Sequence, residues 1–289
     1  MKTSYLTNII LLLIIVALFA VSQQQDQAHP VETSLTNIQA SNIKKITIRR
    51  QDSTDIELQQ TKSHWQLTHP IQAPANRTRM NLLLSLLTTT PHRQTIANNN
   101  ELLAQLGLYP ETLSLQLDQH HFTFGDLEPI SKGRYILYND TVYLIDDHIS
   151  SLLKVNAASF IDNQLIAKTT TITQLQMPLL TNNKLVDELI ITNNSSAEIS
   201  SSPAYSPGTL NKLVQQWQQV TALQVTSSQH QLTQANKVLL WTENSPSPTE
   251  MLIQLDERKL IITNINKQLS YHFPAAVATQ LFLSTNDLN

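Results

Sequence analysis

An almost uninterrupted apolar run, from Leu6 to Val21, constrains this chain more than any other stretch. As a helix it would be roughly 24 Å long, somewhat short of the roughly 30 Å hydrocarbon core of a bilayer. The run offers no polar face, which argues against a buried helix inside a globular core. Because the rest of the chain is polar, we expect this run to act at a membrane.

Two interpretations of the run remain open. In the first, residues 6–21 are an uncleaved transmembrane anchor, with Tyr5 at one interface. In the second, residues 1–22 are a signal peptide, with Lys2 before the apolar run and small residues, Ala20 and Ser22, at the cleavage site. Because Lys2 precedes the run, both interpretations place the rest of the chain on the far side of the membrane.

The composition excludes several classes of function. The chain has no cysteine, which excludes disulfides, thiol catalysis, Cys-ligated zinc and a lipid-modified cysteine. A net charge of −3 gives no basic footprint for nucleic acid. The four glycines do not have the spacing of a phosphate-binding loop, and neither a Gly-x-Ser-x-Gly turn nor a His-Glu-x-x-His helix occurs. We therefore expect no nucleic-acid partner and assign no cofactor.

The order of predicted elements recurs along the chain. Residues 23–41 are polar and aperiodic and read as a tether. Strands, a helix, four strands and a helix then follow in residues 42–165, and the same order returns in residues 166–289. Short turns join most strands, which favours antiparallel sheets. The predicted fold class is α+β: an N-terminal transmembrane helix followed by two similar lobes of mainly antiparallel sheet with packed helices, the second a repeat of the first.

Individual elements have local signals. Pro74-Ala75-Asn76 opens a helix whose apolar residues run from Met80 to Leu87, and Gly107 ends a short helix as a C-cap. Asn139-Asp140 predicts a hairpin turn. Further helices are expected at Asp147–Val155, after Thr209 and after Pro274.

The series of motifs in the first lobe resembles a known family. It runs from Trp65-Gln66-Leu67 through Leu106-Gly107-Leu108-Tyr109-Pro110 to the hairpin between Tyr135 and Tyr143. These motifs, in this order over Ile43 to Val155, resemble the bacterial membrane proteins of domain-of-unknown-function family 4340. The resemblance implies an envelope protein found beside components of an ABC-type export system connected with gliding motility. The chain departs from the family at Gln51–Thr54, where the family has a glycine turn, and the family supplies no catalytic residues.

Clusters of possible metal ligands have simpler interpretations. His120 and His121, with Asp118 and Asp126, offer good ligands for zinc or manganese. Adjacent residues of a strand point to opposite faces, so we interpret both histidines as surface residues of a hairpin. Asp146-Asp147-His148 has a metal-binding alternative, but Asp147 is more simply the N-cap of the following helix.

The remaining polar and aromatic candidates are interpreted in the same way. Two carboxylate pairs, Asp55 with Glu57 and Asp256 with Glu257, fall in turns or on strand faces and predict a solvated surface. Trp217 and Trp241 are expected in the core, while Trp65 is open between core and ligand groove. The densest basic group could touch anionic lipid, but we favour a charged strand edge; its members are Lys44, Lys45, Arg49 and Arg50.

These observations predict a non-enzymatic protein. We expect a membrane-tethered, extracytoplasmic binding or scaffold protein of the bacterial inner membrane, single-pass, with its soluble part in the periplasm and another envelope protein as partner. An accessory role in an ABC-type export system is the form that the resemblance implies. The alternative is a small-molecule- or metal-dependent envelope enzyme with a site between the lobes. No residue is assigned a catalytic, cofactor-binding or metal-binding role.

Overall fold

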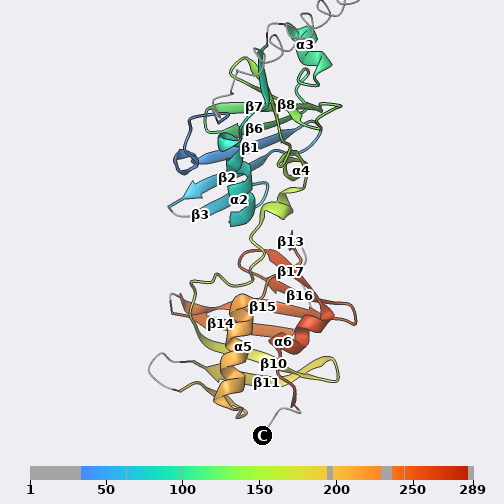
Figure 1. Ribbon diagram of the computed structural model, residues 1–289. Coiled ribbons are helices and arrows are strands. Elements are labelled where there is room, and N and C mark those ends of the chain that lie inside the picture. The colour runs from blue at the N-terminus through green and yellow to red at the C-terminus, as the bar shows by residue number, and fades with distance from the viewer. Residues whose placement is uncertain are drawn as a thin grey trace, which may run out of the picture.

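The computed structural model describes residues 34–62, 64–97, 99–193, 198–228, 236–243 and 245–285. Two lobes lie one above the other and are joined by a narrow connection (Figure 1). Each lobe is one antiparallel sheet with helices on one face. The antiparallel sheets were expected, but the helices are few and short, so the described chain is mainly β with some helices instead of a balanced α+β fold.

The first lobe contains a nine-stranded sheet with the order β4-β3-β2-β1-β6-β7-β8-β9-β5. Its strands are β1 (Lys45–Arg50), β2 (Ile56–Thr61), β3 (His64–His69), β4 (Ala73–Pro74), β5 (Arg93–Ile96), β6 (Leu113–Leu117), β7 (His120–Leu127), β8 (Arg134–Tyr138) and β9 (Thr141–Ile145). Its helical elements are η1 (Ala40–Asn42), α2 (Arg77–Leu84), η2 (Ser85–Thr88), α3 (Asn100–Gln105), α4 (Ser150–Leu153) and η3 (Ala157–Phe160).

The second lobe contains an eight-stranded sheet with the order β12-β11-β10-β14-β15-β16-β17-β13. Its strands are β10 (Ile172–Thr181), β11 (Lys184–Thr192), β12 (Ser200–Ser202), β13 (Gln224–Ser227), β14 (Asn236–Thr242), β15 (Ser245–Leu255), β16 (Lys259–Asn264) and β17 (Leu269–Pro274). Its helical elements are α5 (Pro207–Gln219), η4 (Ala275–Val277) and α6 (Ala278–Leu281).

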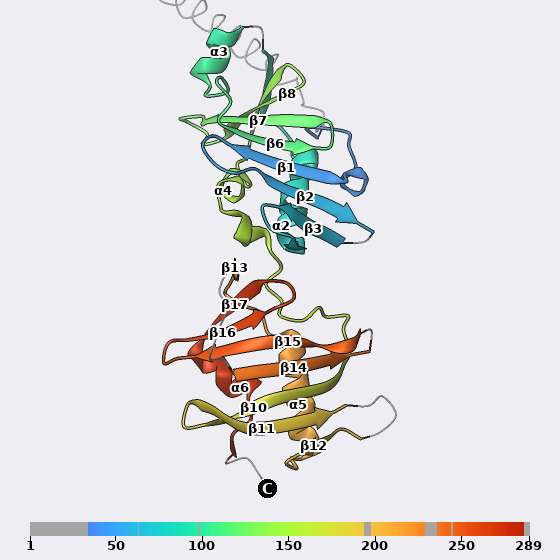
Figure 2. The ribbon, with the colours of Figure 1, turned by 180° about the vertical axis from the view of Figure 1, so that it is seen from behind.

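The two sheets have the same strand order. Without the short edge strand β4, the first sheet has eight strands, from β3 at one edge to β5 at the other. Each has a counterpart at the same position in the second sheet: for example, β1 corresponds to β10, β6 to β14 and β5 to β13. The main helices are α2, which follows β4, and α5, which follows β12. Both cover the same side of the molecule (Figure 1) and leave the other sheet faces open (Figure 2).

Each lobe also begins in the same way. The backbone N–H of Leu35 donates to the carbonyl of Thr89, 2.7 Å away, and that of Leu165 donates to the carbonyl of Val220 at 3.5 Å. Thr89 and Val220 are the C-caps of η2 and α5. The chain therefore enters both sheets from the end of the helix that packs on them.

The helix opened by Pro74-Ala75-Asn76 forms as predicted. The Asn76 side chain accepts the Arg79 N–H at 3.1 Å, which makes Asn76 the N-cap of α2. Met80, Leu83 and Leu87 are fully buried on the sheet. Burial of this apolar stripe holds the helix, which continues as the 3₁₀ turn η2.

The short elements around the first sheet differ more from expectation. Gly107 follows α3 with φ +68, as expected of a C-cap glycine, and Asn139-Asp140 has positive φ at both residues in the β8–β9 turn. The helix expected over Asp147–Val155 is only the single turn α4, with Ile149 as its N-cap. Strand β5 has four exposed residues and no alternating pattern, so no local sequence pattern predicts it.

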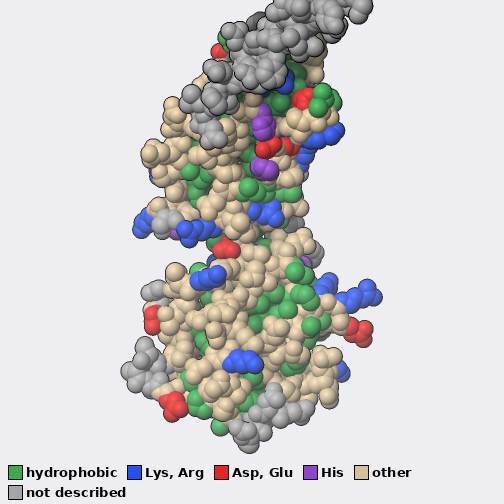
Figure 3. All heavy atoms as spheres, viewed as in Figure 1, with side chains coloured by type: hydrophobic (Ala, Val, Ile, Leu, Met, Phe, Trp, Pro, Cys, Tyr) green, Lys and Arg blue, Asp and Glu red, His purple; other side chains and the backbone are tan. Residues whose placement is uncertain are grey.

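A short connecting segment, residues 160–165, is bonded to both lobes. Toward the first lobe, Asn76 N–H donates to the Phe160 carbonyl and Asp162 N–H to the Pro74 carbonyl, both at 2.7 Å. Toward the second, Ala222 N–H donates to the Asn163 carbonyl at 2.8 Å. Backbone hydrogen bonds on both sides therefore fix the narrow connection that Figure 3 shows as a waist.

The expected membrane anchor, residues 6–21, lies outside the described residues. In the ranges that the structure does describe, no helix is long and apolar enough to cross a membrane. The end of the expected tether is described, and it is not a free linker. Residues 34–41 lie against the first lobe with Leu35 and Thr36 buried, and η1 begins within them.

Candidate functional site

A hollow of about 580 Å³ opens on the first lobe where the chain before β1 meets the turn between β6 and β7. This volume falls in the range of roughly 300–1,000 Å³ typical of small-molecule sites. The residues that line the hollow are Asn37, Ile38, Gln39, Asn42, Ile43, Asp118, Gln119 and His120.

The first wall of the hollow is the lead-in segment, residues 34–43. Besides the Leu35 bond, the Thr36 hydroxyl donates to the Leu87 carbonyl at 3.0 Å and accepts the Ile38 N–H at 3.2 Å. Ile43, at the end of the segment, is 1% exposed and belongs to the core. The wall is thus held at both ends, although most of its side chains are polar.

The second wall is the β6–β7 turn, and Asp118 attaches it to the first wall. Its carboxylate accepts the backbone N–H groups of Lys44 at 3.1 Å and Lys45 at 2.7 Å. Asp118 has φ 50, a conformation that Asp tolerates better than most residues. Its carboxylate therefore joins two backbone segments.

His120 stands at the rim of the hollow with both ring nitrogens bonded. Nδ1 lies 3.0 Å from the Tyr138 hydroxyl, and Nε2 lies 3.0 Å from the side-chain amide nitrogen of Gln119. An amide N–H can only donate, so Nε2 accepts and Nδ1–H donates to Tyr138. Tyr138 in turn stacks on Phe122, with ring centroids 4.5 Å apart. The ring is therefore fixed in one orientation.

His121 points to the opposite face, as the strand periodicity predicted. Its Nε2 lies 2.6 Å from Glu111 Oε2. The hydroxyls of Ser114 and Thr123 also donate to this carboxylate, at 2.7 and 2.6 Å. Both hydroxyls are bonded to the carboxylate and neither to the histidine, so the cluster lacks the nucleophile–base contact of a catalytic triad.

The electrostatics of Glu111 follow from these contacts. Partial burial raises the pKa of its carboxyl, but the hydrogen bonds from Ser114, Thr123 and His121 outweigh it and hold the pKa below its usual value. Glu111 is therefore a charged acceptor that fixes the chain before β6 to the open sheet face.

The metal-binding alternatives do not assemble. Asp126 lies against Gly107, away from Asp118 and the two histidines. Asp146 pairs with His92 at 2.9 Å, whereas Asp147 bonds the Arg134 guanidinium at 2.6 Å. Within the described ranges, no group of three or more His, Cys, Asp or Glu side chains could hold a metal ion.

The Asp147 side chain does cap the following helical turn, α4, although Asp147 lies two residues before the N-cap residue Ile149. Its carboxylate accepts the Ser150 N–H at 3.0 Å and also the Ser150 hydroxyl. The Arg134 guanidinium bonds the carboxylate and the Gly125 carbonyl. Partial burial raises the pKa of Asp147, and the bonds from Ser150 and Arg134 lower it further than burial raises it.

The predicted carboxylate pairs are paired with other groups instead of with each other. Glu57 forms an ion pair with Lys45 at 3.0 Å, and Asp55 approaches Arg49 at 3.5 Å. Asp256 accepts two backbone N–H groups of its own turn. Asp55, Glu57 and Asp256 are each thus engaged by groups of the protein itself.

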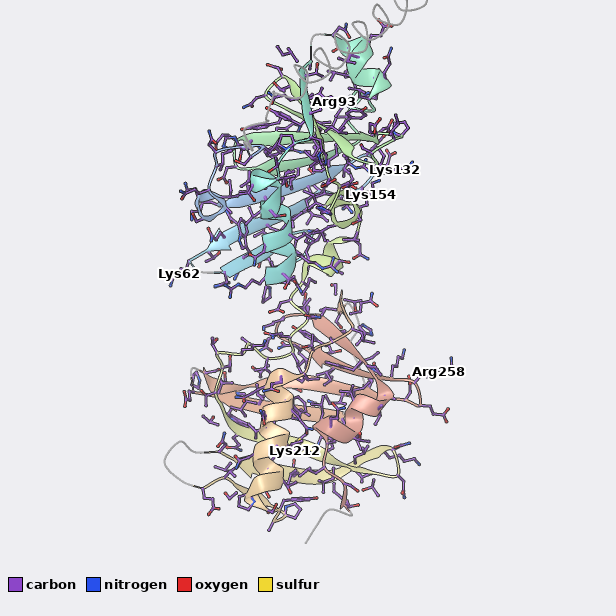
Figure 4. The ribbon with its side chains drawn as sticks, in the orientation of Figure 1. Lys62, Arg93, Lys132, Lys154, Lys212 and Arg258 are labelled. Carbon is purple, nitrogen blue, oxygen red and sulfur yellow. The ribbon has the colours of Figure 1, made fainter. Side chains whose placement is uncertain are left out.

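The basic group is not the strand edge that the sequence suggested. Strand β1 lies inside the sheet, between β2 and β6. Lys45 and Arg49 are on the open face in ion pairs, while Arg50 points the other way and bonds the Val155 carbonyl at 2.6 Å. Figure 4 shows six other basic residues spread over both lobes: Lys62, Arg93, Lys132, Lys154, Lys212 and Arg258.

The three tryptophans differ in their environments. Trp217 is fully buried, and its Nε1–H donates to the Leu281 carbonyl at 2.7 Å. Trp65 is half-buried against the core. The core position expected for Trp241 is wrong: Leu240 takes it, and Trp241 is half-buried on the open face of the second sheet.

Sequence reasoning missed the hollow because one wall was assigned to the tether. Asn37, Gln39 and Asn42 lie in a polar stretch without periodicity. The available signal was the pair of apolar residues Leu35 and Ile38 inside that stretch. Only the fold brings this segment beside the β6–β7 turn, some 75–80 residues later in the chain.

Comparison with known proteins gives one match. No curated protein and no solved structure matches the chain. The model of a family described as "Domain of unknown function (DUF4340)" matches residues 65–240. This match is more than half of the chain and runs from β3 of the first lobe into β14 of the second, beyond the Ile43–Val155 range of the resemblance. The chain therefore belongs to the DUF4340 family.

Proposed function

We propose that this chain is a membrane-tethered, extracytoplasmic binding or scaffold protein and not an enzyme. The observation that supports this proposal most is the joining of two sheets of the same strand order into one elongated body. The connecting segment is hydrogen-bonded on both sides, to Pro74 and Asn76 in the first lobe and to Ala222 in the second. Such a body presents long open sheet faces to a partner (Figure 2).

The pairing of its polar groups favours binding over catalysis. Asp118, Glu111 and Asp147 each accept several hydrogen bonds from the protein itself. Groups used in this way hold segments of backbone together. Catalytic groups, in contrast, need a free reacting atom within reach of a substrate.

The surface and the N-terminal run support the proposed setting. Figure 3 shows a face covered mostly by uncharged polar side chains and backbone, with few charged groups. The apolar run at residues 6–21 supplies the proposed single-pass anchor in the bacterial inner membrane, which leaves both lobes in the periplasm. The proposed partner is another envelope protein, and the resemblance favours a component of an ABC-type export system.

Site-specific cross-linking in native membranes tests the proposal. A photoreactive residue would replace Asn42 at the hollow, Gln94 on the exposed edge strand β5, or Gln254 on the open face of the second sheet, all exposed positions. We expect a reproducible protein adduct from one of these surfaces and not from the others. No adduct from any of them, together with a metabolite or metal bound to the purified protein, would favour the envelope-enzyme alternative.

A further inference from the structure

Among the described residues, no lysine or arginine side chain lines the hollow on the first lobe. Anionic ligands such as phosphates and carboxylates are usually held by Arg, Lys or several aligned backbone N–H groups, and none of the lining side chains supplies this. The described lining therefore has no group suited to an anionic ligand, and its one carboxylate, Asp118, already accepts hydrogen bonds from the protein.

The lining is rich in primary amides. Asn37, Gln39 and Asn42 are exposed, and their side chains have no hydrogen-bond partner among the residues that the structure describes. Each amide offers two N–H donors and a carbonyl acceptor. A hydroxyl group of a ligand can likewise donate one hydrogen bond and accept another. One amide side chain can therefore form hydrogen bonds with two neighbouring hydroxyls of one ring.

The opposite side of the hollow is rigid. Asp118 ties the turn to β1, and the imidazole of His120 is held between Gln119 and Tyr138. Half-buried Ile38 adds a small apolar surface to the same hollow. Fixed walls reduce the conformational entropy lost on binding, and an apolar contact suits the C–H face of a sugar ring.

We infer that this hollow is a binding site for a neutral saccharide. The amides of the lead-in segment hold the hydroxyls, Ile38 contacts a ring face, and His120 closes one side. This inference rests on the proposed function, because it names the chemical class of one ligand of a binding protein. A cross-link to a protein partner could form whether or not a saccharide binds in the hollow.

Calorimetric titration of the full chain with neutral disaccharides tests the inference. The chain would be held in a detergent without a sugar headgroup, and the probes would be maltose and N,N′-diacetylchitobiose. Glucose 6-phosphate and glucuronic acid serve as charged comparisons. We expect saturable binding of at least one neutral disaccharide and weaker binding of both charged sugars.

Variants assign any binding to the hollow. Replacing both Asn37 and Asn42 by Ala removes amides without disturbing a side-chain hydrogen bond of the fold, and should weaken binding about tenfold or more. Gln94→Ala, a matched amide on exposed β5, should leave affinity unchanged. Unchanged melting temperatures would show that both variants fold.

Three outcomes overturn the inference: no neutral disaccharide binds, the charged sugars bind as well as the neutral ones, or the Asn37/Asn42 double variant keeps full affinity. If a protein adduct forms in membranes while no sugar binds, the saccharide site fails and the proposed function stands. If sugars bind at the hollow but no adduct forms from any surface, the scaffold proposal fails instead.

Discussion

Two glycines let the end of α3 approach strand β7. The Asp126 N–H donates to the Leu106 carbonyl at 2.8 Å, which draws the two backbones together. A Cβ on Gly125 would overlap the Leu106 carbonyl oxygen, and one on Gly107 would lie 2.5 Å from the Asp126 carboxyl carbon. The absence of a side chain at Gly125, where an added Cβ meets backbone, is therefore a condition for this contact, whereas Gly107 is favoured by its φ of +68, which L side chains rarely adopt.

Gly125→Ala should destabilise the first lobe by roughly 1–3 kcal/mol, because the added methyl group meets backbone, which cannot rotate away. Chemical denaturation measures the change. Gly208→Ala is the matched control: Gly208 lies in the first turn of α5, and the nearest atom to an added Cβ is 4.0 Å away. It should be neutral or slightly stabilising. Equal losses in both variants would contradict the packing argument.

Asp147→Asn should destabilise the protein by about 3–5 kcal/mol at pH 7, because it leaves the buried Arg134 guanidinium without its counter-ion. The side chains of Arg134 and Asp147 are only 10% and 13% exposed, so solvent screens the pair little. Asp146→Asn alters the neighbouring, exposed pair with His92 and should have little effect. An equal effect of the two substitutions would contradict a special role for the buried pair.

The effect of Asp147→Asn should also depend on pH. The folded state lowers the pKa of Asp147, so its contribution is complete above the unfolded-state value of about 3.9 and is lost as pH falls through the folded-state value. The gap in unfolding free energy between wild type and variant should therefore narrow below about pH 4. Urea titrations at a series of pH values measure it, and a constant gap would contradict the assignment.

At the scale of elements, the sequence predicted what depends on local patterns. The apolar spacing of Met80, Leu83 and Leu87 gave α2, and Asn139-Asp140 gave the β8–β9 turn. Strand β5 could not be predicted, because it is held by pairing with β9 and not by burial of its own side chains. Long-range pairing likewise decides that β1 lies inside the sheet and that Lys45 and Arg49 form ion pairs there.

The candidate site shows the same division. The opposite orientations of His120 and His121 follow from the period of a strand and were predictable. That Asp118 would bond two N–H groups at the start of β1, across more than 70 residues, depends on the register between β1 and β6. No local sequence pattern encodes the register between these two strands.

Helices α5 and α6 are joined by one buried hydrogen bond, from Trp217 to the Leu281 carbonyl. Trp217→Phe should cost about 1–3 kcal/mol, because it leaves that carbonyl unsatisfied in the core. Hydrogen exchange should rise in the second lobe, with peptides of the first lobe as an internal reference. Trp241→Phe, at a half-buried position, is the matched control and should change exchange little. A uniform rise in both lobes would contradict a local role.

At the scale of the molecule, the lobes form a tandem pair in which the edge strand β13 of the second sheet faces the connection. Contacts between η3 and β13 and the bonds of the connecting segment hold this arrangement. From the sequence, the tandem arrangement could be predicted only as a repeated order of strands and helices. The repeat of the first lobe in the second and the boundary at residues 165 and 166 remain predictions about domains, although the strand orders agree.

Inserting eight Gly and Ser residues between Asp162 and Asn163 should free the lobes from each other, because it separates the bonds to Pro74 from those to Ala222. Small-angle scattering of the chain from Ser34 onward should give a radius of gyration above the roughly 18 Å of a compact globule of that length. The insertion should broaden the distance distribution, while the same insertion in the exposed turn at Asp52-Ser53 should not. Identical distributions for the two insertions would contradict a fixed connection.

The attachment of the lead-in segment has a mechanical consequence. Any pull through the chain upstream of Ser34 acts first on residues 34–43, which a few hydrogen bonds and the buried side chains of Leu35 and Ile43 hold to the lobe. Strand β1, bonded on both sides, comes next and resists more. Because the same segment forms a wall of the hollow, tension would open the hollow before it acts on the sheet. A ligand bound in the hollow would therefore raise the force needed to detach the segment from the lobe.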